Sequence, residues 1–221
     1  MASKIGVIVE GAIDYALVSV LLERIAYDRA SYDWPVHPDE CADIIQIRKR
    51  GQGGVLEKVR ALIGVLRNVV PDYDFFVVVL DQKTSSVQQK LRKMFPRQGF
   101  VFGIAIKEIE AWWLGDRLST LGWLGLDADS IRHVRYSAKR YKAERDDNPK
   151  LTLDELTCLS DNLDFCYGDG NLRLAREFSE TWKNSARLDD IEQQCPRGFG
   201  KFARKTASEF VRVKADKGRL F

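Results

Sequence analysis

The sequence is poor in the residues that build disulfide frameworks, zinc sites and histidine-based catalysis. Four cysteines occur among its 221 residues: Cys41, Cys158, Cys166 and Cys195. No two of them form a Cys-x-x-Cys pair, so this scattered pattern predicts reduced thiols of an intracellular protein and argues against both a disulfide framework and a zinc site. The two histidines, His37 and His133, are too few for a histidine triad or a multi-histidine metal site.

Long apolar runs are also missing. No stretch approaches the roughly 18 residues of a membrane-spanning helix. The apolar run near the N-terminus is interrupted by Glu10 and is too short for a signal peptide. We therefore expect a cytoplasmic protein with no membrane partner. The sequence also contains no internal repeat and no low-complexity segment.

The composition is that of a globular protein. Hydrophobic residues make up 45% of the chain, which is enough for a real core, and charged residues make up 30%. The length corresponds to one large domain or two small ones. The formal net charge of +3 permits a nucleic-acid partner without requiring one. Whether the chain forms a homo-oligomer stays open at this point.

Short apolar segments alternate with helical patterns in the first half of the chain. We expect strands at residues 5–9, 44–47, 75–80 and 100–106, and a loop at 28–41. Strands that alternate with helices predict an α/β fold with a parallel sheet and right-handed crossovers. The second half predicts a turn-rich segment at 118–126 and helices at 127–135, 138–145, 152–159, 172–182, 188–194 and 202–213. We accordingly divide the chain into an α/β domain, 1–117, and a helical extension packed on it, 118–221.

Acidic residues follow three of the predicted strands. Glu10 and Gly11 end the first, Asp81 ends the most apolar one, and Glu108 and Glu110 follow the last. Parallel strands bring their carboxyl ends to one edge of a sheet, where crowded carboxylates repel one another unless a cation neutralises them. Oxygen ligands favour Mg²⁺ or Mn²⁺ over zinc. The sequence therefore predicts a metal site, and the alternative is a set of unconnected strand-end charges and helix caps.

Three of these segments resemble a known family. VEGAIDYAL, VVVLDQKTSSV and IAIKEIEAWWLGD are similar to the Toprim domain of topoisomerases, primases and OLD-type nucleases. More narrowly, they resemble the small Toprim-like proteins known as DUF4276, which occur in bacterial defence and mobile-element loci. Two later segments, CYGDGNLRLAREF and CPRGFGKFARK, are similar to the C-terminal half of that family.

The resemblance implies Mg²⁺-dependent (or Mn²⁺-dependent) cleavage of DNA or RNA phosphodiesters in anti-phage defence, with a separately encoded ATPase as a possible partner. On this resemblance Glu10 would be the acid/base residue beside the metal and Asp81 a metal ligand. In our nuclease hypothesis the candidate catalytic acids Glu10, Asp81 and Glu110 hold the ion, and Glu108 assists as a further metal ligand.

One position departs from the Toprim pattern. The second aspartate of the usual Asp-x-Asp motif is Lys83 here, and a lysine provides no metal ligand. Its ammonium group could bind a phosphate or take over part of the cation's electrostatic role, and Glu108 or Glu110 could supply the missing ligand. The alternative to a nuclease is therefore a non-catalytic or conditionally active subunit that binds nucleic acid or a nucleotide and partners an ATPase.

Basic residues and glycines provide candidate contacts to phosphate. A basic triplet and a glycine loop precede a helical pattern at residues 55–70, and helix N-termini attract anions. The loop lacks the GK[ST] ending of a Walker A motif, and a tight strand-to-helix turn is the alternative. Residues 130–150 form a basic stretch that suits a nucleic-acid backbone or a solvated helix face. The candidates are Gly11, Arg48, Lys49, Arg50, Gly51, Gly53, Lys83, Arg140, Arg204 and Lys205.

Overall fold

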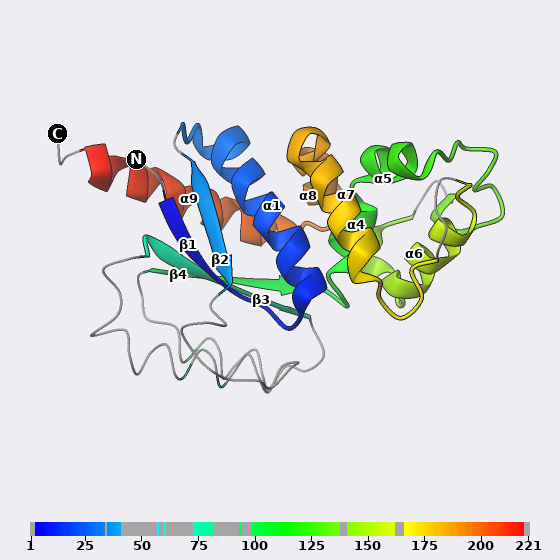
Figure 1. Ribbon diagram of the computed structural model, residues 1–221, viewed down its shortest axis with the longest axis horizontal. Coiled ribbons are helices and arrows are strands. Elements are labelled where there is room, and N and C mark those ends of the chain that lie inside the picture. Colours follow the sequence, from blue (N-terminus) through cyan, green and yellow to red (C-terminus); the bar gives the residue numbers. More distant parts are fainter. Residues whose placement is uncertain are drawn as a thin grey trace.

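A parallel β-sheet forms the centre of the protein. The computed structural model describes residues 3–33, 35–40, 57, 60, 73–81, 93, 99–137, 141–161 and 166–218. Its strands are β1 (Ser3–Ile8), β2 (Val36–Glu40), β3 (Phe75–Asp81) and β4 (Phe100–Ala105). They pair in the order β2-β1-β3-β4, and every pairing is parallel. Helices flank the sheet (Figure 1), so the predicted α/β class with a helical C-terminal part is confirmed.

The strand β3 is the most deeply buried element of the sheet. All seven of its residues are buried, as expected for the β-branched and aromatic run FFVVVL. Phe75, Val77 and Val79 join the main hydrophobic core. The alternate residues point to the opposite face of the sheet because side chains alternate along a strand. This burial on both faces explains why the strand could be predicted from composition alone.

The strand β2 was missed by the sequence analysis, which predicted a loop over residues 28–41. The segment VHPDE carries no apolar alternation and contains Pro38, both of which weaken the strand signal. Within the described sheet, β2 pairs on one side only, with β1, and a proline is tolerated on such an edge strand. The predicted strand at 44–47 and the glycine loop after it lie outside the described residues.

Two long helices cover one face of the sheet. α1 (Ala12–Ala30) starts directly after Gly11, and α9 (Phe199–Gly218) lies beside it and against β4. The Phe210 ring of α9 packs edge-on against Phe75, with 5.0 Å between ring centroids. A Cβ atom at Gly103 of β4 would lie 2.8 Å from the Phe202 ring, so this position accepts only glycine without a shift of α9. Phe199 and Phe202 are both fully buried and belong to the hydrophobic core.

The remaining helices extend the molecule beyond the sheet (Figure 1). They are α4 (Glu110–Gly115), α5 (Arg117–Leu124), α6 (Pro149–Cys158), α7 (Leu172–Ser185) and α8 (Leu188–Gln194), with short 3-10 turns at Arg135–Ser137 and Ala143–Arg145. α7 lies alongside α1, and Trp113 of α4 stacks on Phe178 of α7 with 4.4 Å between ring centroids. Residues on both sides of the predicted boundary at 117/118 thus belong to one hydrophobic cluster. The division into two domains stays a prediction.

Several predicted helix boundaries were wrong because capping side chains set them. Residues 118–126 were predicted as a turn, yet α5 forms there because the Asp116 side chain accepts a hydrogen bond from the amide of Ser119. Residues 127–135 and 141–145 contain turns and short 3-10 segments in place of α-helices. The helix expected at 152–159 begins earlier, with Asn148 as its N-cap and Pro149 in its first turn. Thr152, the first residue of the predicted range, lies inside the helix, where its buried hydroxyl group donates a hydrogen bond to Asp146 at 2.6 Å.

The prediction of reduced cysteines is wrong for one pair. Cys158 and Cys166 form a disulfide that joins the end of α6 to the loop before α7. They are eight positions apart in the sequence, a spacing that carries no sequence signature, so only the fold could reveal the pair. Cys195 is a buried free thiol, and Cys41 lies outside the described residues. Among the helices that the structure describes, none combines the length and the apolar character that crossing a membrane requires.

Candidate acidic site at the carboxyl edge of the sheet

The first two acidic motifs meet at one edge of the sheet. Glu10 lies two residues beyond β1, and Asp81 is the last residue of β3, which is the parallel neighbour of β1. The backbone amide of Asp81 donates a hydrogen bond to Glu10 Oε1 at 3.0 Å. The Asp81 side chain is itself buried. The predicted convergence of Glu10 and Asp81 is therefore confirmed.

The third acidic motif follows β4 and contributes the most buried carboxyl group of the site. Glu110 is the first residue of α4, and its side chain is only 2% exposed. Tyr167 donates its phenolic proton to Glu110 Oε1 at 2.8 Å. Burial raises the pKa of Glu110, and Glu108 raises it further, whereas Lys150 and the Tyr167 hydroxyl oppose the shift. This carboxyl group is therefore held in surroundings where a negative charge is costly unless a cation is near.

Lys150 brings a positive charge to these acids. Its ammonium nitrogen lies 3.7 Å from Glu108 Oε1 and 3.9 Å from Glu110 Oε1. Burial alone would lower the pKa of Lys150, but the surrounding carboxylates outweigh that effect and raise it. Lys150 is thus protonated at neutral pH. The contributing acids are Glu110, Glu108, Asp81 and Asp14.

Asp14 is a further acid that the sequence analysis did not include. It lies in the first turn of α1, where its Oδ2 accepts a hydrogen bond from the Gly11 amide at 2.8 Å. Burial and the nearby Glu110 raise the pKa of Asp14 to about 7, with Glu10 adding to the rise and the Gly11 amide and Lys150 opposing it. Asp14 therefore exchanges a proton near neutral pH. The Gly11 amide, expected to bind phosphate, is already engaged by Asp14.

We refer to this group as the acidic site. It consists of Glu10, Asp14, Asp81, Glu108 and Glu110, together with Lys150 and Tyr167. The acids were found from strand ends, and Asp14 could have been found from its place four residues after Glu10, on the first turn of the adjoining helix. Lys150 was counted only within a basic stretch, and Tyr167 had no sequence signal.

Of the candidate phosphate-binding residues that the structure describes, Gly11 lies at the acidic site, whereas Arg204 and Lys205 lie on α9. Arg204 of α9 pairs with Glu192, which in turn pairs with Arg29 near the end of α1. Arg29 lies fifteen residues along α1 from Asp14, or about 22 Å at 1.5 Å per residue. Lys205 is exposed on α9, next to Arg204 in the sequence. The remaining candidates lie outside the described residues: Arg48, Lys49, Arg50, Gly51, Gly53, Lys83 and Arg140.

The donor set of the acidic site suits a hard divalent cation. All of its anionic groups are carboxylates, and Glu108 Oε2 and Glu110 Oε2 are buried oxygens without a hydrogen-bond partner among the described residues. Such oxygens are ligands that Mg²⁺ or Mn²⁺ accepts. However, in the part of the chain that the structure describes, no three acids of the site form a group whose carboxylate oxygens could together hold one ion. Lys150 supplies part of the neutralising charge instead.

Comparisons of the chain with protein-family models, with curated proteins and with solved structures find no match. The Toprim resemblance therefore remains an expectation from the sequence motifs.

Proposed function

We propose that this protein is a metal-dependent phosphodiester hydrolase of the Toprim type that acts on DNA or RNA, in bacterial defence against phage. The main support is the meeting of Glu10 with the backbone of Asp81, beside the acids of the third motif. A solitary strand-end acid has many structural explanations. Acids from two strand ends and from the helix after a third strand, around one lysine, have few, because such a group costs stability unless it holds a ligand or a cation.

Each residue of the site has a distinct role in this proposal. Asp81, Glu108 and Glu110 would hold Mg²⁺ or Mn²⁺, which when bound polarises a phosphate and acidifies a bound water. Glu10 takes up or delivers a proton at the reacting oxygen. Lys150 offsets the charge of the incoming phosphate, and Tyr167 fixes the orientation of Glu110 through its 2.8 Å hydrogen bond.

A second function is favoured by the position of Lys150. Because its ammonium group already neutralises part of the charge of Glu108 and Glu110, the site is tolerable without a metal ion. Lys83 also favours this alternative, because it replaces the second aspartate of the Asp-x-Asp motif and provides no metal ligand. In this alternative the protein is a non-catalytic or conditionally active subunit that binds nucleic acid or a nucleotide and works with a separately encoded ATPase.

Cleavage assays on the purified full-length chain distinguish the two functions. Supercoiled plasmid DNA and a long RNA are incubated with Mg²⁺ or Mn²⁺ and wild type, Glu10→Gln, Asp81→Asn or Glu180→Gln. Glu180 is an exposed acid of α7 that serves as the matched control. The nuclease proposal expects metal-dependent cleavage by wild type and Glu180→Gln alone. A wild type that binds nucleic acid without cutting it would support the subunit, and cutting that persists in EDTA or in Glu10→Gln would come from a contaminant.

A further inference from the structure

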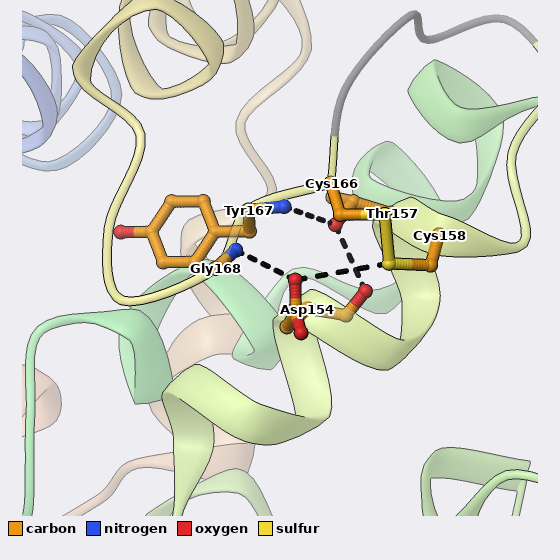
Figure 2. The surroundings of a disulfide bond; sticks show 6 residues. All are labelled: Asp154, Thr157, Cys158, Cys166, Tyr167 and Gly168. Atoms are coloured by element: carbon orange, nitrogen blue, oxygen red, sulfur yellow. Dashed lines mark hydrogen bonds between the residues drawn. A yellow bond between two sulfur atoms is a disulfide. The ribbon is translucent and has the colours of Figure 1, made fainter.

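A cluster of three potential metal ligands lies at the end of α6, apart from the acidic residues at the sheet edge. Asp154 and Cys158 are one helical turn apart on α6, and Cys166 faces them from the loop before α7 (Figure 2). One ligand atom from each residue lies within 4.8 Å of the other two. Two sulfur atoms and one carboxylate oxygen form a donor set that differs in kind from the all-oxygen acidic site.

The distance between the carboxylate and the helix cysteine already fits a tetrahedral metal site. Cys158 Sγ lies 3.8 Å from Asp154 Oδ1, and a disulfide sulfur has no proton with which to form a hydrogen bond there. Zinc–sulfur and zinc–oxygen bonds of about 2.3 and 2.1 Å put the two ligand atoms about 3.6 Å apart in a tetrahedron. The two sulfur atoms must separate, to about 3.8 Å on the same geometry.

Hydrogen bonds hold the loop against α6 independently of the disulfide. The Gly168 amide donates to Asp154 Oδ1 at 2.6 Å, and the Tyr167 amide donates to Thr157 Oγ1 at 2.8 Å (Figure 2). These bonds keep Cys166 beside Cys158 when the sulfur–sulfur bond is broken. The Gly168 amide also orients the Asp154 carboxylate, the role that outer hydrogen-bond donors play around metal ligands.

Solvent exposure differs between Cys158 and Cys166 on the one hand and Cys195 on the other. Cys158 and Cys166 are both exposed, so a reductant and a metal ion reach them from solvent. Cys195, by contrast, is fully buried and contacts the carbonyl oxygen of Ala111. Among the cysteines that the structure describes, the exposed pair therefore combines reactivity with a neighbouring carboxylate.

We propose that the Cys158–Cys166 pair, when reduced, binds Zn²⁺ together with Asp154. A dithiol reductant supplies two electrons and two protons, which convert the disulfide into two thiols while the dithiol becomes a disulfide. Zinc binding then releases the two thiol protons, and the ion takes two thiolates, the Asp154 carboxylate and a water as its fourth ligand. Thiolates select zinc over the hard ions that suit the acidic site. Disulfide and zinc are thus alternative states of one site.

Cobalt binding to the full-length protein tests this proposal. Reduced and oxidised protein are titrated anaerobically with Co²⁺, and the thiolate-to-cobalt absorption in the near ultraviolet is recorded. We expect one equivalent bound by the reduced form, displaced by Zn²⁺, and no such absorption in the oxidised form. The absorption reports sulfur ligation, so cobalt held by carboxylates alone does not contribute to it.

Variants separate the three-ligand site from other thiols. Asp154→Asn is expected to weaken Co²⁺ binding about tenfold or more, and the double change Cys158→Ser with Cys166→Ser to abolish the absorption. Asp169→Asn, which alters an exposed acid of the same loop, should bind as wild type does. Because the oxidised Asp154→Asn protein retains the disulfide, its circular dichroism reports folding separately from binding. Undiminished affinity in Asp154→Asn, or absorption that remains in the double variant, would overturn the proposal.

Discussion

The two halves of the acidic site reached their places in different ways. The acids Glu10, Asp81, Glu108 and Glu110 follow strands, and parallel pairing carries every strand end to the same edge. Lys150 and Tyr167 come from α6 and the loop before α7, which approach that edge only through helix packing. The positions of the acids thus depend on the sheet. The positions of Lys150 and Tyr167, which interact with these acids, depend on the packing of the helices. Altering each half separately tests this contrast.

The largest expected effect comes from comparing two buried glutamates. Under the proposed function, Glu110→Gln should lower cleavage by about 10²- to 10⁴-fold, the range for a lost charge or proton-transfer group. Its free energy of unfolding should change little, because burial already raises the pKa of Glu110 and penalises its charge.

Glu144 is the matched control. Its carboxylate accepts hydrogen bonds from the Arg197 and Gly198 amides at 2.9 and 2.6 Å, where the chain enters α9. Glu144→Gln should cost about 2 kcal/mol in urea unfolding while leaving cleavage per folded molecule intact. Equal activity losses in the two variants would remove the distinction between functional and structural acids.

The next largest effect is the loss of stability when the Cys158–Cys166 disulfide is removed. Replacing both Cys158 and Cys166 by serine should lower the free energy of unfolding by about 2.5 kcal/mol, because a short loop is no longer closed in the unfolded chain. Chemical denaturation of the oxidised wild type and the double variant measures this. The two proteins should unfold alike once the wild type is reduced, and a persisting difference would mean that the serines perturb the packing of α6.

A smaller effect is expected from removing the positive charge of the acidic site. Lys150→Met should lower the free energy of unfolding by about 2 kcal/mol. This is less than the loss on breaking a fully buried ion pair, because the Lys150 side chain is 31% exposed. The loss should shrink as the pH falls, because the raised pKa of Glu110 lets this carboxyl group become protonated, and it then no longer needs a cation. Lys150→Arg serves as the control that keeps the charge. A loss independent of pH would show that packing, and not charge, accounts for the role of Lys150.

The smallest effect, counted per pH unit, is a pH dependence from Asp14. Because its pKa is raised from 3.8 to about 7 on folding, the folded chain binds more protons than the unfolded chain between these values. The free energy of unfolding should therefore decrease as the pH rises from about 4 to 7, by at most about 1.4 kcal/mol per pH unit. Asp14→Asn should flatten this slope in metal-free buffer. An unchanged slope in the variant would assign the dependence to other groups.

Local patterns were sufficient to predict much of the sheet and its acids. The run FFVVVL could only be a buried strand, and the segments after Glu10 and in 172–182 and 188–194 carried clear helical periodicity that the structure confirms. Strand ends in a parallel sheet share an edge, so the meeting of Glu10 and Asp81 followed from the order of the elements. The sequence by itself thus determined the α/β class and the origin of the acids.

Tertiary structure decided the features that depend on contacts between distant segments. The edge strand β2 is held by its pairing with β1, because VHPDE has no strand pattern of its own. Tyr167 meets Glu110 across 57 residues of chain, and the Cys158–Cys166 bond forms because α6 ends beside the loop before α7. Such meetings are set by the packing of whole helices on one core, which no local pattern of residues encodes.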